Sequence, residues 1–267
     1  MKSIEGIGLD QVREVYSGAE GKLWELIMGQ QIHIGGLKSS MDLADKAGIA
    51  PGVCGVDFCC CTGAGMRFLI QFRNVDSMIG VDATPHTVET GMHRNEALGI
   101  GNQIQFVIAD VCDSGLPSES ADFVWGEDAW CYVVDKARLV SEAARIVKRG
   151  GTIAFTDWVE GPNPMTAQES ERFLKFMKFA NVLDVAGYSE LLKANNCKVI
   201  HAEDTGRYSP CIDLYLQMLD MQLTYDALKV IGFNTDVMQS LAGEMSFLQG
   251  LARESKVIQG LFVAQKD

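Results

Sequence analysis

The chain has 267 residues, which is enough for one large domain or two small ones. Its 35 acidic residues outnumber its 23 basic residues and give a formal net charge of −12, so neither nucleic acid nor an anionic membrane is expected as a partner. Hydrophobic residues make up 47% of the chain, which excludes general disorder, and no apolar run is long enough for a transmembrane helix.

The chain start and the cysteines bear on the cellular compartment. No basic segment followed by an apolar one opens the sequence, so we expect no secretory signal. The eight cysteines show no CxxC spacing, which favours reduced thiols in the cytoplasm over a disulfide framework. Cys59, Cys60 and Cys61 are adjacent, and side chains of consecutive strand residues alternate between faces. We therefore predict no metal site. Thiol-based arsenic methylation would need several cysteines to meet, and it is disfavoured because Cys112, Cys131, Cys197 and Cys211 are spread over four elements.

Residues 1–45 predict an N-terminal helical cap or lid. From residue 46 onward, short apolar runs alternate with longer amphipathic ones. This alternation predicts an α/β fold with a Rossmann-like, doubly wound and mostly parallel sheet. The expected strands are 53–60, 77–82, 104–109, 121–125 and 152–157, and the expected helices are 66–72, 85–96 and 136–147, the last closed by Arg149-Gly150-Gly151.

The C-terminal half adds more helices to the same predicted domain, residues 46–267. Helical insertions are expected at about 158–195 and 209–255. A strand at 198–202 separates them, and a strand at 257–264 follows. Helical additions around a parallel sheet usually form a lid or a substrate pocket.

Acidic residues recur where the predicted strands end, at Asp57, Asp82, Asp110 and Asp157. Open α/β sheets bind their ligands at the carboxyl edge of the sheet, so these carboxylates point to a binding site there. The small-residue turn that ends at Gly65, between a strand and a helix, is typical of nucleotide sites but weak evidence alone.

Two of these acids narrow the choice of ligand. Asp82, which ends the strand after the turn, suits the two hydroxyls of a ribose, although a dehydrogenase would also use it. Asp110 offers a carboxylate to an adenine amino group, and Val111 offers a backbone N–H to a ring nitrogen. The combination favours S-adenosylmethionine over NAD.

The motifs Asp57-x-Cys-Cys-x-Thr-Gly63, Gly80-Val-Asp82, Ala109-Asp-Val111 and Glu142 to Gly151 resemble those of class I S-adenosylmethionine-dependent methyltransferases. The resemblance is specific over about residues 50–160. Outside it, residues 26–35 are similar to the start of sarcosine/dimethylglycine N-methyltransferases, although Gln30 and Gln31 stand where that family usually has an acidic pair.

The resemblance implies roles for a set of cofactor residues. A turn would surround the methionine part, Asp82 would hold the ribose, Ala83 would lie against the adenine, and Glu127 would offer backbone near the sulfonium. The family usually has glycine at Cys61, where a positive φ would cost on the order of 1–2 kcal/mol. The cofactor residues implied are Asp57, Cys59, Cys61, Thr62, Gly63, Asp82, Ala83, Asp110, Val111 and Glu127.

Candidates for the acceptor site lie outside these motifs. His33, in a glycine-flanked segment, is the candidate catalytic base, with an interfacial or core histidine as the alternative. Arg207 or Arg172 would pair with an acceptor carboxylate. The aromatic rings that could hold a methylated cation, each of which is also a core candidate, are Tyr16, Trp24, Trp130, Tyr132 and Trp158.

The resemblance therefore implies a methyltransferase that acts on a small molecule by direct in-line transfer and yields S-adenosylhomocysteine. An amine such as glycine, sarcosine or dimethylglycine is the favoured acceptor. Carbon, oxygen or sulfur acceptors remain alternatives, as do a nicotinamide oxidoreductase and a non-catalytic protein that binds adenosyl ligands. A homodimer is compatible with the sequence.

Overall fold

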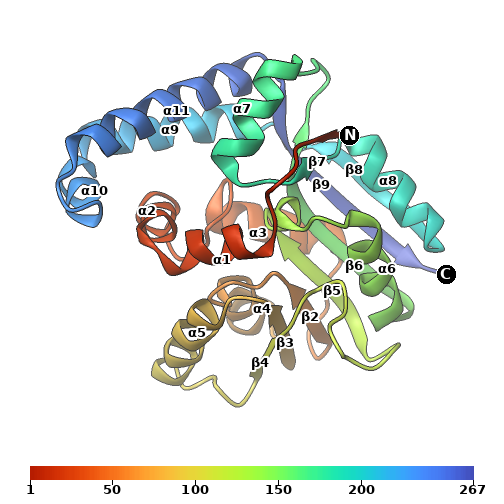
Figure 1. Cartoon of the computed structure of the whole chain (residues 1–267). Coiled ribbons are helices and arrows are strands. Elements are labelled where there is room, and N and C mark those ends of the chain that lie inside the picture. Colours follow the sequence, from red (N-terminus) through yellow and green to blue (C-terminus); the bar gives the residue numbers. More distant parts are fainter.

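A seven-stranded sheet forms the centre of the computed structural model, which describes residues 1–267 (Figure 1). The predicted doubly wound, mostly parallel sheet is confirmed: the strand order is β4-β3-β2-β5-β6-β9-β8, and only β9 runs antiparallel to its neighbours. The strands are β2 (Cys54–Phe58), β3 (Ser77–Asp82), β4 (Ile104–Ile108), β5 (Ala121–Glu127), β6 (Val147–Glu160), β8 (Cys197–Asp204) and β9 (Val257–Lys266).

Helices cover both faces of this sheet, as its apolar strands require. On one face, α3 (Gly36–Ala47) and α4 (Ala64–Arg73) bury Leu43, Leu69 and their neighbours against Phe123 and Trp125 of β5. On the other face, α6 (Lys136–Ile146) and α8 (Val185–Ala194) complete a second core. The helix α5 (Pro85–Ala97) begins with proline in its first turn, as predicted, and lies beside β4.

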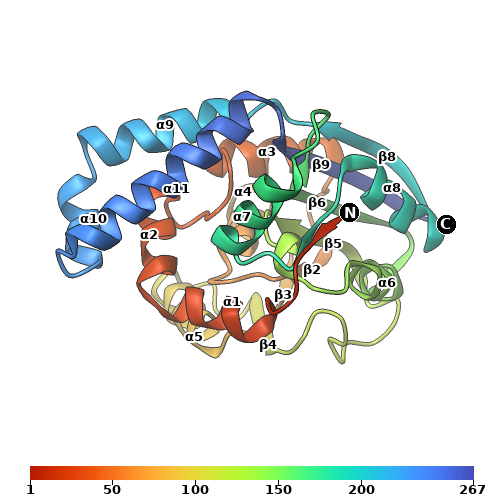
Figure 2. The same ribbon diagram turned by 45° about the horizontal axis from the view of Figure 1, so that its top comes forward.

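A third layer of helices stands at one end of the sheet (Figure 2). It has its own buried cluster, which includes Trp24, Phe173 and Leu248. A two-stranded sheet of β1 (Lys2–Ser3) and β7 (Asn181–Val182) ties the N-terminus to this layer. The helices of the layer are α1 (Leu9–Ser17), α2 (Ala19–Met28), α7 (Ala167–Met177), α9 (Tyr208–Met221), α10 (Thr224–Val230) and α11 (Thr235–Arg253).

Some elements differ from the sequence expectation. The helix α6 ends at Ile146, and β6 begins at Val147, so the Gly150-Gly151 pair lies inside a strand instead of closing the helix. The helices α3 and α8 fall within the ranges expected for the cap and for an insertion, yet both pack on the sheet. No helix is both long and apolar enough to cross a membrane.

Asp157 also differs from its expected place at the ligand edge, because it lies inside β6 with no exposed surface. Its carboxylate accepts hydrogen bonds from the Cys131 amide at 2.9 Å and the Tyr188 hydroxyl at 2.5 Å. Burial raises the pKa of Asp157 to about 6, although the nearby Lys136 ammonium acts to lower it. Lys136 is itself buried and donates to the carbonyls of Cys131 and Val133. It acts on Asp157 through its charge and not through a direct ion pair.

Candidate functional site

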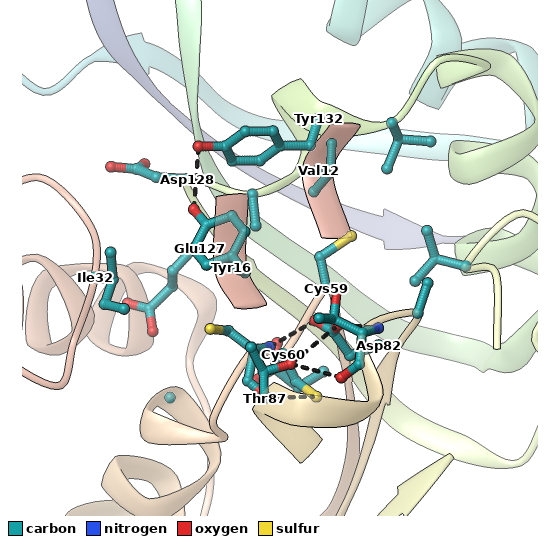
Figure 3. Close-up of a pocket in the computed structure, with 18 of the residues that line it drawn as sticks. Val12, Tyr16, Ile32, Cys59, Cys60, Asp82, Thr87, Glu127, Asp128 and Tyr132 are labelled. Carbon is teal, nitrogen blue, oxygen red and sulfur yellow. Dashed lines mark hydrogen bonds between the residues drawn. The ribbon is translucent and has the colours of Figure 1, made fainter. Parts of the chain in front are cut away.

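A cavity of about 220 Å³ lies at the carboxyl ends of β2, β3, β4 and β5, beside α1 and the loop at residues 30–33 (Figure 3). It collects most of the predicted site residues, because parallel strands bring their carboxyl ends to one edge. Tyr16 and His33 line it together with the predicted cofactor residues Asp57, Cys59, Cys61, Thr62, Asp82, Ala83, Asp110, Val111 and Glu127.

The turn after β2 is tightly folded. The amides of Cys59 and Cys60 both donate to the Val81 carbonyl, at 2.9 and 3.3 Å. Cys59, Cys61 and Gly63 have φ of 58°, 50° and 77°, all in the left-handed region. Gly63 caps α4 and does not line the cavity, so its part is conformational. Burial raises the pKa of the Cys59, Cys60 and Cys61 thiols, so the thiols stay neutral.

Cys61→Gly is expected to change the affinity for S-adenosylhomocysteine by less than about tenfold, which corresponds to about 1.4 kcal/mol. The cysteine already holds the left-handed conformation, and its amide donates to Asp82 at 2.8 Å, so glycine leaves the turn in place. Titration calorimetry on both proteins measures this. A gain of about 100-fold or more would instead show that the Cys61 side chain obstructs the site.

Asp82 is buried at the end of β3, with 9% of its surface exposed. Its Oδ1 accepts from the Thr84 amide at 2.8 Å, and its Oδ2 accepts from the Cys61 amide at 2.8 Å. Each carboxylate oxygen has more than one lone pair, so both oxygens can still accept a hydroxyl from the cavity. Next to it, the Ala83 carbonyl accepts from Arg13 Nε of α1 at 2.9 Å, which fastens the cap helix to the rim.

The third acid, Asp110, follows β4 at the exposed end of the cavity. Its Oδ1 accepts from the Cys112 amide at 2.8 Å, which leaves Oδ2 for a ligand. The Val111 amide makes no hydrogen bond within the chain and is free to donate. A carboxylate acceptor beside a free N–H matches the two edge groups of an adenine ring.

Asp57 and Glu127 form the floor of the cavity. The Asp57 carboxylate is buried and makes no hydrogen bond within the chain. Burial raises the pKa of Asp57 well above its usual range, and the carboxylates of Glu127 and Asp82 raise it further. A Cβ at Gly65 would lie 2.8 Å from Glu127 Oε2 and 3.3 Å from Asp57 Oδ2, so glycine keeps this floor open. A cationic ligand group beside Asp57 would lower this pKa and stabilise the carboxylate, so the floor favours such a group.

The opposite wall comes from α1 and the short 3₁₀ turn after β5. The hydroxyls of Tyr16 and Tyr132 lie 3.1 Å apart, with their rings edge to face (Figure 3). His33 is buried, and its Nε2 lies 3.3 Å from Glu127 Oε1 and 3.2 Å from Ser40 Oγ. The His33 Nδ1 has no hydrogen-bond partner.

The loop at residues 30–33 adds side chains whose part in the site is not predictable from the sequence motifs. Gln30, Gln31 and Ile32 all line the cavity. Gln30 Oε1 accepts from Arg67 at 3.4 Å, which leaves the Gln30 amide nitrogen free to donate toward a ligand. The glycines that flank this loop, Gly29 and Gly35, both have positive φ. Such glycines in the sequence indicate a turn, and here the loop turns back over the sheet.

Asp128 fastens this loop to the sheet. Its Oδ2 accepts from the Ile34 amide at 2.8 Å and from Gln259 Nε2 at 2.9 Å. Gln259, which belongs to β9, also donates to the Ile34 carbonyl at 3.1 Å. Three segments that are distant in the sequence therefore meet at one buried carboxylate behind the cavity wall.

Three tryptophans expected at the acceptor lie elsewhere. Trp130 has no exposed surface and stacks on Phe155 at 3.9 Å between ring centroids, filling the space over Gly126, where a Cβ would lie 2.3 Å from its indole nitrogen. Trp158 packs edge to face against Tyr208. Trp24 lines a separate cavity of about 580 Å³ between α2 and the helices α9 to α11.

The expected carboxylate partner Arg207 does not line the cavity either. It donates to Asp42 Oδ2 at 2.6 Å and to Ser39 Oγ at 2.9 Å, so its charge is already paired. Arg172, the other candidate, forms an ion pair with Glu244 at 3.1 Å on the surface. An acceptor carboxylate would have to find another partner.

Comparison with known proteins agrees with this geometry. Residues 56–155 match the family model described as a methyltransferase domain. The chain is 25% identical over 265 residues to phosphoethanolamine N-methyltransferase 1 of Arabidopsis thaliana, covering 97% of this chain and 51% of the relative. It is 28% identical over 179 residues to dimethylglycine N-methyltransferase of Parasynechococcus marenigrum, covering 59% and 61%.

A solved structure shows the same fold over nearly the whole chain. Phosphoethanolamine N-methyltransferase 2 of Haemonchus contortus, in complex with phosphomonomethylethanolamine and S-adenosylhomocysteine, superposes with a TM-score of 0.85. The two are 17% identical, and the match covers 95% of this chain and 58% of that one. The chain thus spans about half the length of the first curated relative and of this structure.

Proposed function

We propose that the chain, which has the domain and fold of class I S-adenosylmethionine-dependent methyltransferases, methylates an amine nitrogen of a small molecule. The carrying observation is that Asp57, Asp82 and Asp110, from three adjacent parallel strands, line one cavity. S-adenosylhomocysteine is the second product.

The residues present fit the cofactor. Bound S-adenosylmethionine supplies an electrophilic methyl group on a positively charged sulfur. Asp82 would accept the ribose hydroxyls, and Asp110 with the Val111 amide would hold the adenine edge. The unpartnered Asp57 carboxylate suits the ammonium group, and the free Gln30 amide suits the carboxylate.

At the acceptor end, the chain binds and orients the amine. The wall of Tyr16 and Tyr132 offers two hydroxyls, and Ile32 restricts access of water. In the transfer, the amine lone pair forms the new nitrogen–carbon bond while the carbon–sulfur bond breaks and its electrons stay on sulfur. Where the product ammonium carries a proton, we propose that His33, which lines the cavity and whose Nδ1 has no hydrogen-bond partner, accepts it.

His33→Gln is expected to lower kcat about tenfold, because alignment of the amine accounts for most of the rate and proton removal for a smaller part. The affinity for S-adenosylhomocysteine should stay within about threefold. Ser40→Ala, which removes one of the two neighbours of Nε2 and keeps the imidazole, is the matched control and should change kcat less. A pH profile of His33→Gln that coincides in shape with that of the parent protein would contradict a proton-accepting role.

The first test of the function is titration calorimetry with S-adenosylmethionine, S-adenosylhomocysteine and NADH on reduced protein. We expect micromolar binding of both adenosyl ligands and none of NADH. Mass spectrometry then follows transfer of the methyl group to small amines, starting with glycine, sarcosine and dimethylglycine. Adenosyl binding without turnover on any amine, alcohol, thiol or carbon acceptor would favour a non-catalytic binding protein, and no adenosyl binding would overturn the proposal.

Two further expectations belong to this proposal. The eight free thiols suit a reducing cytoplasm. The protein would act as a monomer or homodimer on a small molecule without a nucleic-acid or membrane partner, and analytical ultracentrifugation measures its assembly state.

A further inference from the structure

The charge of the cavity bears on which amine it accepts. We propose that the acceptor is a small amine that carries no anionic group, and not a phosphate ester or an amino acid; this inference rests on the proposed function. The named substrates of the two relatives, phosphoethanolamine and dimethylglycine, both carry such a group.

Among the charged side chains that line the cavity, the acidic ones outnumber the basic ones. A single arginine, Arg138, and no lysine line the cavity. Arg138 donates to the Cys112 carbonyl at 3.5 Å, and the Cys112 amide donates to Asp110. Because Asp110 is the expected adenine ligand, this cation lies at the adenine end of the cavity. The carboxylates that line the cavity are Asp57, Asp82, Asp110, Glu127, Asp128 and Asp135.

At the acceptor end, the Glu127 carboxylate makes the electrostatic potential negative. Its Oε1 is buried and accepts no hydrogen bond, with only His33 Nε2 nearby at 3.3 Å. S-adenosylmethionine brings one net positive charge, which does not offset several carboxylates. A second anion beside Glu127 would meet like charge in a poorly solvated space, whereas an ammonium group or a neutral amine would not.

The arginines around the cavity cannot supply the missing cation without breaking existing bonds. Arg13 is held by the Ala83 carbonyl, and Arg207 by Asp42 and Ser39. Arg67 donates to the Thr62 carbonyl at 2.5 Å and to Asn95 at 3.2 Å, behind the turn. Arg94 donates to the Thr62 hydroxyl at 3.3 Å and forms an ion pair with Glu25 at 2.7 Å. Each lies outside the lining of the cavity.

Matched acceptor pairs test the proposal. Dimethylglycine and its amide differ only in the anionic group, as do phosphoethanolamine and ethanolamine. Calorimetry on protein saturated with S-adenosylhomocysteine measures binding of each member, and mass spectrometry with S-adenosylmethionine measures kcat/KM. We expect the uncharged member of a pair to be preferred by about tenfold or more in both measurements.

A variant that adds a positive charge to the cavity sharpens the test. Gln31 lines the cavity, and its side chain makes no hydrogen bond within the chain. Gln31→Arg is expected to shift the preference toward dimethylglycine by about tenfold, while Gln31→Met, of similar length and uncharged, should leave the ratio within about twofold.

The outcomes separate this proposal from the proposed function. Equal or better use of dimethylglycine or phosphoethanolamine overturns the acceptor class and leaves the methyltransferase function standing. Failure of either pair to bind a protein that does bind S-adenosylhomocysteine also overturns the acceptor class. Failure to bind any adenosyl ligand overturns the function itself.

Discussion

Asp82→Asn is expected to raise the Kd for S-adenosylhomocysteine about 100-fold or more. The carboxylate offers both oxygens to the cavity while each also accepts a backbone N–H, from Thr84 and Cys61. An amide can present only one oxygen, and its NH₂ group would face a donor. Loss of two charge-assisted hydrogen bonds to the ribose costs about 3 kcal/mol or more.

Asp113→Asn is the matched control, because Asp113 is exposed after the same β4 edge and lies outside the cavity lining. It removes the same formal charge and should change the Kd less than about twofold. Calorimetry on both variants, with unfolding midpoints to verify the fold, makes the comparison. A change below threefold for Asp82→Asn would contradict a ribose-binding carboxylate.

Lys136→Met is expected to lower the free energy of unfolding at pH 7 by about 2–3 kcal/mol, because it removes the buried cation that favours the Asp157 carboxylate and the donor to two buried carbonyls. The pKa of Asp157 is raised to about 6, above its value in the unfolded chain. A raised carboxyl pKa contributes stability at low pH that is lost as pH rises through it. The loss of unfolding free energy caused by Lys136→Met should therefore become smaller toward pH 5, where Asp157 is protonated in both proteins.

Urea unfolding of the parent protein and of Lys136→Met at pH 7 and pH 5 measures this loss of free energy. Lys148→Met is the control, since Lys148 forms an exposed ion pair with Asp122, and it should leave the free energy of unfolding nearly unchanged at either pH. A deficit of equal size at both pH values would show that Lys136 acts through packing of its aliphatic stem and not through charge.

Local sequence patterns predicted the sheet and its cofactor edge well. The strand at 77–82 has the predicted bounds, because an apolar run ends at Asp82 and Pro85 opens the next helix. Strand ends, acids and turn glycines lie within a few residues of one another along the chain. Parallel pairing then brings the ends of neighbouring strands together without any information about distant side chains.

The acceptor side could not be predicted in the same way. Whether Trp130 faces the cavity or the core is decided by the open space over Gly126 and the ring of Phe155, which sequence spacing does not reveal. Arg207 is paired with Asp42, which lies 165 positions away in the chain. Such contacts depend on how the helical layer packs, and helical periodicity fixes only which face of a helix is apolar.

The antiparallel strand β9 has a consequence for the order in which the chain folds. It lies between β6 and β8, which do not pair with each other, so both strands keep an open edge until residues 257–266 have left the ribosome. The same strand supplies Gln259, which fastens the loop beside the cavity through Asp128. The strands β2, β3 and β4 of the cofactor edge pair with one another and not with β9, whereas the loop beside the cavity depends on Gln259 of β9. Ligand-binding competence should therefore arise in two stages during synthesis, the adenosyl half before the acceptor half.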